Sequence, residues 1–270
     1  MEKLIPNIVS IAGVDPSGGA GVLADLKAMS ALGGYGCAVI AALTAQNTQG
    51  VTGVQAVSAD FVALQLKTLF DDVRIDAVKI GMLSDVDVIK VVAEAIKTYR
   101  PRYVVLDPVM VAKSGDRLLP ESCVETLKSE LLPLTTLLTP NLPEAAALVG
   151  EDEISDASEM PHLAQKLLSM MAPRAWVLVK GGHLSGEDVP DYLTNGLETV
   201  VLTSVRTQTK NTHGTGCTLS SALATLLPQT ESVPEAMKKA KHYISQAIVH
   251  ADELSVGHGH GPVHHFWEKW

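Results

Sequence analysis

The sequence predicts an α/β protein: a three-layer α/β/α sandwich with a mostly parallel central sheet and an antiparallel edge hairpin, in a single domain over residues 1–270. Short apolar runs alternate with helical patterns along the chain, which is typical of parallel strands joined by helices. The runs are apolar throughout instead of alternating with polar residues, which is typical of strands buried on both faces. They cover residues 8–12, 38–44, 77–80, 103–106, 137–139 and 176–179.

The antiparallel hairpin is expected in the last third of the chain. Asn195 and Gly196 separate the strand-like run that begins at Asp191 from a second run at residues 199–202. Asn-Gly between two such runs is a strong hairpin signal, because both residues tolerate the positive φ that the tight turn requires. The acidic stretch 151–159 reads as a surface loop that leads into a helix, so we expect no domain boundary there.

Composition and charge exclude several classes of protein. The net charge of −9 argues against a protein that grips a phosphate backbone, because that affinity comes from clustered Lys and Arg. Residues 1–13 show no signal-peptide pattern, and the longest nearly apolar run, 37–45, is far short of the roughly 20 residues that span a bilayer. Three scattered cysteines, Cys37, Cys123 and Cys217, suit a reducing compartment. We therefore expect a cytoplasmic protein with neither nucleic acid nor membrane as partner.

A glycine-rich loop before a helical pattern predicts an anion site. Residues 211–217 read NTHGTGC, and small and apolar residues follow to 227. Glycines let the backbone approach a ligand, and the helix N-terminus adds partial positive charge. A plain turn between a strand and a helix is the alternative. Cys217 falls in the first helical turn, where the dipole favours thiolate, so we expect a lowered pKa and a base or nucleophile; simple packing is the alternative.

Four further polar residues follow predicted strands, namely Asp107, Asn141, Glu144 and Lys180. The carboxyl ends of parallel strands meet at one edge of a sheet, so these side chains could converge on one site. Carboxylates hold Mg²⁺ directly or through water, and a lysine neutralises nucleotide phosphates. Together these are the parts of phosphoryl transfer. Taken singly, Asn141 could only cap a helix, Asp107 could brace a turn, and Lys180 could be a solvated strand end.

Two common nucleotide-binding motifs are missing from the sequence. No G-x-x-x-x-G-K-[ST] segment occurs, which excludes a P-loop. The glycine-rich residues 12–21 do not form G-x-G-x-x-G, so a dinucleotide-binding fold is also disfavoured. Another phosphate-binding architecture is needed.

Eight motifs occur in order along nearly the whole chain. They are AGVDPSGGAGVLADLK (12–27), AQNT (45–48), KIGML (79–83), DPVM (107–110), TPNLPE (139–144), KGGH (180–183), NTHGTGC (211–217) and GPVHHF (261–266). Together they resemble the motifs of the bacterial hydroxymethylpyrimidine/phosphomethylpyrimidine kinases, which have a ribokinase-like fold. The resemblance implies ATP-dependent phosphorylation of 4-amino-5-hydroxymethyl-2-methylpyrimidine to its monophosphate, and of the monophosphate to the diphosphate, at one site in thiamine biosynthesis. It also implies Mg²⁺ as a cofactor and a homodimer.

The same resemblance assigns roles to individual residues. Gln46 would pair with the aminopyrimidine edge, since an amide presents both a donor and an acceptor. The substrate group is completed by Gly13, Asp15, Met82 and Val109; the ATP group is Lys180, Asn141, Thr212 and His213; the metal group is Asp107 and Glu144; and the catalytic group is Gly214, Thr215, Gly216 and Cys217. Most ribokinase-like sugar kinases carry Asp at the position of Cys217, so the resemblance does not say whether the thiol removes a proton or stabilises charge.

Alternatives stay open at this point. A pyridoxal or pyridoxine kinase shares the fold and phosphorylates a similar ring, and some enzymes act on both substrates. A catalytically silent sensor is a second alternative, although every phosphate and metal residue is present. The tail histidines at 258, 260, 264 and 265 invite a metal-binding interpretation that no accompanying spacing supports. His213 could equally be a capping residue. Residues 18–21 and 113–117 are candidate flaps over the site.

Overall fold

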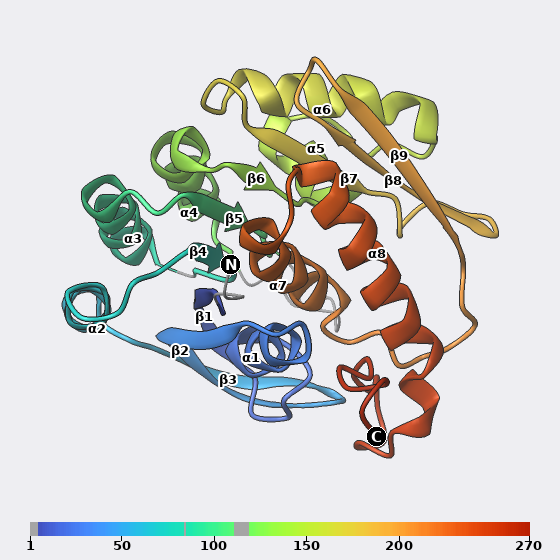
Figure 1. Cartoon of the computed structure of the whole chain (residues 1–270), viewed down its shortest axis with the longest axis horizontal. Coiled ribbons are helices and arrows are strands. Elements are labelled where there is room, and N and C mark those ends of the chain that lie inside the picture. Colours follow the sequence, from blue (N-terminus) through green and yellow to red (C-terminus); the bar gives the residue numbers. More distant parts are fainter. Residues whose placement is uncertain (1–4, 84, 111–118) are drawn as a thin grey trace.

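The computed structural model describes residues 5–83, 85–110 and 119–270, and in them one mixed sheet of nine strands lies between helices (Figure 1). The strand order is β3-β2-β1-β4-β5-β6-β7-β8-β9. The six strands from β2 to β7 in that order run parallel, while β3, β8 and β9 are added by antiparallel pairing at the two edges. The strands are β1 (Asn7–Val14), β2 (Tyr35–Asn47), β3 (Gly50–Ala56), β4 (Ala77–Ile80), β5 (Tyr103–Leu106), β6 (Leu137–Leu138), β7 (Trp176–Lys180), β8 (Asp188–Thr194) and β9 (Thr199–Val205).

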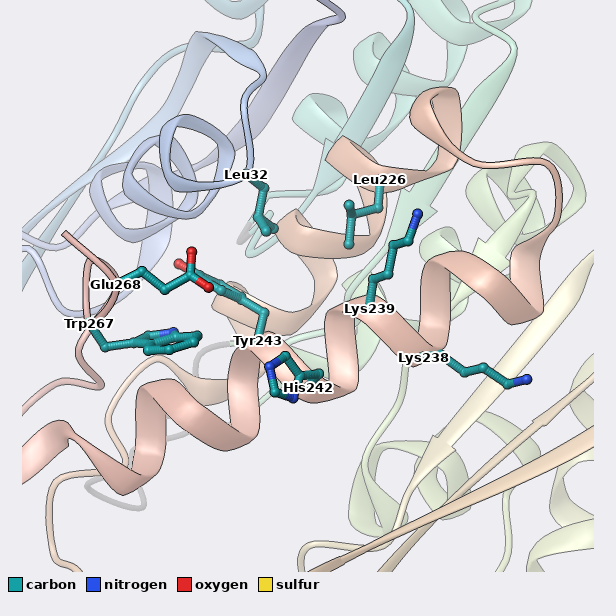
Figure 2. A pocket seen from close by; sticks show the side chains of 8 residues that line it. All are labelled: Leu32, Leu226, Lys238, Lys239, His242, Tyr243, Trp267 and Glu268. Atoms are coloured by element: carbon teal, nitrogen blue, oxygen red, sulfur yellow. The ribbon is translucent and has the colours of Figure 1, made fainter.

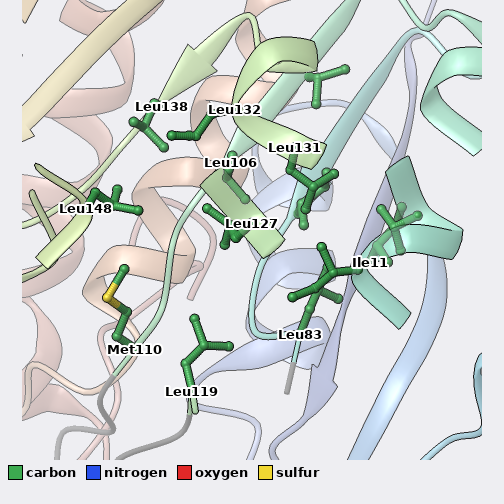
Figure 3. Close-up of a cluster of buried hydrophobic side chains, with 14 of the residues drawn as sticks. Ile11, Leu83, Leu106, Met110, Leu119, Leu127, Leu131, Leu132, Leu138 and Leu148 are labelled. Atoms are coloured by element: carbon green, nitrogen blue, oxygen red, sulfur yellow. The ribbon is translucent and has the colours of Figure 1, made fainter. Parts of the chain in front are cut away.

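Helices cover both faces of the sheet, which confirms the three-layer sandwich (Figure 1). One hydrophobic cluster joins the sheet to the layer α2 to α6, and a second joins its other face to α1, α7 and α8. Figure 3 shows part of the first cluster, where Leu106 and Leu138 of the sheet meet Leu127 and Leu131. The helices are α1 (Gly21–Ala31), α2 (Ala59–Phe70), α3 (Val86–Tyr99), α4 (Glu121–Thr126), α5 (Leu142–Val149), α6 (Met160–Ser169), α7 (Thr215–Leu226) and α8 (Val233–Val249).

The central strands are apolar on both faces because both faces are buried. In β5, Val104 and Leu106 point to the first cluster, while Val105 points to the second. Successive side chains of a strand alternate between faces, so a strand buried on both sides has no place for an alternating polar pattern. The six predicted central strands are confirmed on this ground. Compared with the predicted ranges, β1, β2 and β7 are longer, and β6 ends one residue earlier.

Both edges of the sheet are antiparallel hairpins, of which the sequence predicted one. The β8–β9 hairpin is confirmed, and Asn195 Oδ1 accepts hydrogen bonds from the backbone N–H groups of Leu197 and Glu198 in its turn. The hairpin of β2 and β3 at the other edge was missed. In its turn Asn47 Oδ1 accepts from the N–H groups of Gln49 and Gly50.

No helix in the described part of the chain is both long and apolar enough to cross a membrane.

Candidate active site

Three predicted residues meet at the carboxyl edge of the sheet. Asp107 directly follows β5, Lys180 is the last residue of β7, and Glu144 lies in the first turn of α5. Lys180 Nζ donates a hydrogen bond to Asp107 Oδ1 at 3.0 Å and lies 4.0 Å from Glu144 Oε2. All three side chains are largely buried. This edge is where the strand ends of an open parallel sheet form a ligand crevice.

The start of α7 adjoins this cluster. A Cβ atom built on Gly216 would lie 3.3 Å from Lys180 Nζ and 3.5 Å from Asp107 Oδ2. The first N–H groups of a helix have no partner within the helix, so an anion between Lys180 and this helix end would meet both an ammonium and backbone donors. The structure therefore brings the glycine-rich loop and the strand-end residues to one place.

Gly214 holds the loop in the shape that the site needs. Its φ is +76°, which favours glycine, and an added Cβ would lie 1.7 Å from the carbonyl oxygen of Gly19. The loop is closed by Thr215, whose hydroxyl donates to the carbonyl oxygen of Thr212 at 2.7 Å. The loop before α7 thus packs directly against the loop before α1, and no residue larger than glycine fits between them.

Asn141 and Glu144 form a capping box at the start of α5. Asn141 Oδ1 accepts from the N–H of Glu144, and Glu144 Oε2 accepts from the N–H of Asn141, each at 2.8 Å. Glu144 also accepts from the N–H of Met110. The capping interpretation of Asn141 thus describes its side chain here, and the cap fixes the Glu144 carboxyl beside Lys180 and Asp107.

The cluster carries more negative than positive groups in a desolvated place. Burial raises the pKa of Glu144 to about 7, with Asp107 adding to the rise and Lys180 opposing it. Burial by itself disfavours the ammonium of Lys180, but Asp107 and Glu144 outweigh it and raise its pKa. The lysine is therefore charged at neutral pH, while the pKa of Glu144, at about 7, lies close to neutral pH.

Cys217 does not have the pKa that its position in a helix predicts. Burial raises the pKa of the thiol to about 11; Lys79 and a hydrogen bond from the Gly21 N–H oppose the rise, while Asp25 and Asp107 reinforce it. The expectation of a lowered pKa was wrong, because desolvation by the surrounding elements exceeds the effect of one helix end. In the free protein Cys217 is a neutral thiol.

The predicted substrate residues lie at or just after the carboxyl ends of β1, β2, β4 and β5. Gly13 and Met82 are neighbours, since a Cβ on Gly13 would lie 2.7 Å from Met82 Cε. Gln46 Oε1 accepts from the Thr44 hydroxyl at 3.1 Å, and its Nε2 lies 3.5 Å from Nε2 of His213. Val109 lies in the tight turn after β5, where its N–H donates to the carbonyl oxygen of Asp107.

His213 lies with the substrate group, although the sequence analysis grouped it with ATP. Its Nε2 is 2.7 Å from Asp15 Oδ2. Burial alone would raise the pKa of Asp15, but hydrogen bonds from His213 and Ser17 outweigh it and lower the pKa. Asp15 also accepts from the N–H of Ala20, so its carboxylate ties the loop 15–20 together.

Only one of the two candidate flaps lies within the described part of the chain. The loop 18–21 is held at several points: Lys27 Nζ donates to the carbonyl oxygen of Gly18 at 2.7 Å, and Val14 forms a bridge with Gly21. Residues 113–117 lie outside the described part of the chain.

Of the four tail histidines, His264 and His265 are buried in the packing of the C-terminal segment, whereas His258 and His260 are exposed. His265 Nε2 lies 3.0 Å from the Thr218 hydroxyl, and burial lowers the pKa of this imidazole to about 3. His264 donates its N–H to the carbonyl oxygen of Ala247. Among the described residues no three His, Cys, Asp or Glu side chains come together as a metal site. The segment also forms a bridge between Pro262 and His213, which supports the anion loop from behind.

A buried ion pair beneath Cys217 escaped the sequence analysis. Lys79 Nζ donates to both carboxylate oxygens of Asp25, at 2.9 and 2.8 Å, and both side chains are fully buried. The signal was present, since Lys79 and Ser10 interrupt strands that are otherwise apolar.

The hollow in Figure 2 is remote from this chemistry. It is lined by Leu226 at the end of α7, by α8 and by Trp267, whereas the site surrounds the first turn of α7. Helix α7 has twelve residues, so its first and last residues lie about 16 Å apart along the helix axis.

Comparison with known proteins agrees with the fold. The family model described as phosphomethylpyrimidine kinase matches residues 15–264. The hydroxymethylpyrimidine/phosphomethylpyrimidine kinase of Escherichia coli is 53% identical over 264 residues, which is 98% of each chain. The crystal structure of Bacillus subtilis pyridoxal kinase with ADP is 35% identical with a TM-score of 0.89, over 97% of this chain and 98% of that chain. The phosphomethylpyrimidine kinase of Clostridium difficile is 40% identical with a TM-score of 0.79, over 90% and 99%.

The sheet order, the covering helices and the site at its carboxyl edge define a small-molecule kinase with a ribokinase-like fold. Within this class, the match to the family model and the 53% identity to a curated relative indicate one family. The chain belongs to the phosphomethylpyrimidine kinase family.

Proposed function

We propose that this chain, as a single domain over residues 1–270, transfers the γ-phosphoryl group of ATP to the hydroxymethyl group of 4-amino-5-hydroxymethyl-2-methylpyrimidine, and then phosphorylates the monophosphate to the diphosphate. The names of its relatives support this proposal, since some describe a kinase of hydroxymethylpyrimidine and phosphomethylpyrimidine and others refer to thiamine biosynthesis. The observation that carries the proposal is the meeting of Lys180, Asp107 and the α7 N-terminus, next to the loop in which His213 lies beside Gln46 of β2.

The phosphate side of the site performs electrostatic work. Lys180 neutralises charge on the nucleotide phosphates, and the first turn of α7 with Gly214, Thr215 and Gly216 receives the transferred group. Phosphoryl transfer depends mainly on such positioning and charge stabilisation. Asn141 and Thr212 lie beside these residues, Asn141 as the cap of α5 and Thr212 through its bond with Thr215.

The residues present fit a magnesium ion. Mg²⁺ is usually held by one or two carboxylates together with substrate phosphates and water, and Asp107 and Glu144 supply two carboxyl groups within reach of the same lysine. When bound, the ion would offset the charge of the transferring phosphoryl group. Glu144 must release its proton to serve, so we expect magnesium affinity to rise as pH rises through about 7.

The pyrimidine side gives orientation and selectivity. Gln46 offers an acceptor and a donor to the aminopyrimidine edge, and its Thr44 contact fixes the amide. Gly13, Met82 and Val109 line the ring, and Asp15 with His213 closes the far side. Cys217 faces the attacking hydroxyl. Pyridoxal is a second substrate candidate, favoured by the TM-score of 0.89 with a pyridoxal kinase.

A homodimer in the cytoplasm is the expected form of the enzyme. Large apolar side chains are exposed on β2, β3 and α2, and a surface of this kind favours burial against a second copy. They are Leu43, Val54, Phe61 and Leu64, each about half exposed. The three cysteines are free, which suits a reducing compartment. Light scattering would test the dimer, with Val54→Lys as the variant expected to give monomer.

The test of the proposed activity is ATP turnover by the purified protein with three acceptors: the hydroxymethylpyrimidine, its monophosphate and pyridoxal. Each is measured with Mg²⁺ and with EDTA. Magnesium-dependent turnover of both pyrimidines is expected. Pyridoxal as the preferred acceptor would overturn the substrate, and full turnover in EDTA would overturn the metal site.

A further inference from the structure

The Lys79–Asp25 pair is a complete hydrogen-bonded unit inside the protein. Asp25 accepts from the Ser10 hydroxyl at 2.5 Å and from the Ser221 hydroxyl at 2.7 Å, in addition to Lys79 Nζ. Ser10 and Lys79 are register partners on the neighbouring strands β1 and β4. Four elements, β1, β4, α1 and α7, thus converge on one carboxylate.

Packing alone does not account for this unit. Taking two charges out of water costs several kcal/mol per ion, and apolar residues of similar size at a buried ion pair are often as stable or more stable. The surroundings are suited to apolar residues, since Ala77 and Val105, which lie beside Lys79 on the same face of the sheet, are fully buried and aliphatic. A role for the charges is therefore indicated.

The pair lies one helical turn behind Cys217. Ser221 follows Cys217 by four residues in α7, so both side chains lie on the same face of that helix. The same spacing recurs in α1, where the N–H of Gly21 donates to the Cys217 thiol and Asp25 lies four residues later. Two helices thus present their first turn to the thiol and their second turn to the ion pair.

The ammonium of Lys79 reaches toward the reacting edge of the sheet. Its Nζ lies 2.9 Å from the position of a Cβ built on Gly81, the residue that follows β4. The lysine therefore extends along the strand to the end where the site lies, and Asp25 holds it there from the side of α1.

We propose that Lys79, held by Asp25, is a positioning residue of the phosphoryl transfer: its fixed positive charge stabilises negative charge that develops at Cys217 and the attacking hydroxyl. The inference deepens the proposed function and rests on the role that it gives to Cys217. Four charged groups interact electrostatically with the thiol: Lys79 from β4, Asp25 from α1, Asp107 after β5 and Lys180 at the end of β7. Lys79 lowers the pKa of the thiol against the larger effect of burial.

The test measures the thiol and the reaction separately. In a Cys37→Ser, Cys123→Ala background, the rate of alkylation by iodoacetamide at pH 8.5 reports the thiolate fraction of Cys217 without any turnover. The test variants are Lys79→Met and the double variant Lys79→Met/Asp25→Asn, which removes both charges while keeping the shapes. Steady-state kinetics with the hydroxymethylpyrimidine give kcat and KM for each variant.

A control comes from a second ion pair. Lys97 Nζ and Glu130 Oε2 are 3.0 Å apart at the surface, in the layer that covers the opposite face of the sheet from α7. The double variant Lys97→Met/Glu130→Gln also loses an ion pair and is expected to leave the alkylation rate and kcat within about twofold, because distant exposed charges are screened.

The double variant at Lys79 and Asp25 is expected to alkylate at least about fivefold more slowly and to lose at least about tenfold in kcat, with KM within about threefold. Lys79→Met alone should be alkylated more slowly still, since it leaves the charge of Asp25 unpaired. Adding Asp25→Asn should then restore part of the alkylation rate, a recovery that is not expected if the pair has a purely structural role. A folded double variant with an unchanged alkylation rate, or with slower alkylation but unchanged kcat, overturns the proposal. Failure of the proposed role of Cys217 is seen separately, as full turnover by Cys217→Ala. If Lys79→Met does not fold, the double variant decides alone.

Discussion

Glu144 offers a measurable link between the site and the stability of the protein. Its pKa is raised from 4.5 to about 7, and the difference corresponds to on the order of 3 kcal/mol. The folded protein keeps this proton up to about pH 7, whereas the unfolded chain loses it near 4.5. The stability that the group contributes is therefore fully present below pH 4.5 and is lost as pH rises through about 7.

The substitution Glu144→Gln removes this titration and retains an oxygen to accept from the Asn141 N–H. We expect the free energy of unfolding of the variant, relative to the natural protein, to improve by up to about 3 kcal/mol between pH 5 and pH 8. Urea unfolding at both pH values, without nucleotide or magnesium, measures it. Glu130→Gln is the control, since Glu130 pairs with Lys97 at the surface. Equal changes at pH 5 and pH 8 for Glu144→Gln would refute the reasoning.

Three further substitutions test the remaining parts of the site. Lys180→Met should lower kcat/KM for ATP by about 100-fold, because a buried ammonium aimed at phosphate is lost; a loss below about threefold in steady-state kinetics would contradict its role. Gly214→Ala should destabilise the protein in thermal unfolding by more than about 2 kcal/mol through its positive φ and the clash with Gly19, whereas Gly150→Ala, with a φ of +74° and open space, should lose only about 1 kcal/mol. Gln46→Leu should raise KM for the aminopyrimidine at least about tenfold and leave KM for ATP unchanged; equal effects on both would contradict its assignment.

The central strands were predictable because strands buried on both faces appear in the sequence as continuous apolar runs. Strand β3 shows no such run. Its residues Gly50–Ala56 include two glycines and lie at the solvent-exposed edge, so neither an apolar run nor a clean alternation results. An edge hairpin becomes evident only when its partner strand, β2, is known to extend to Asn47.

Within the site, the meeting of Asp107, Glu144 and Lys180 followed from one rule, that the carboxyl ends of parallel strands share an edge. Electrostatics did not follow from sequence in the same way. The high pKa of Cys217 depends on how closely α1 and the strands enclose it, and the pairing of His213 with Asp15 joins residues 198 positions apart. Long-range enclosure of this kind is set by tertiary packing, which local patterns do not contain.

The most direct test of the account compares both phosphorylation steps in the natural protein and in Cys217→Ala, with binding of magnesium and ATP measured in parallel. We propose that both steps use one site around the first turn of α7, so kcat for the pyrimidine and for its monophosphate should fall by the same factor, at least about 100-fold, while nucleotide affinity stays within about threefold. Retention of either step at more than about a third of its rate would contradict a single site organised around Cys217.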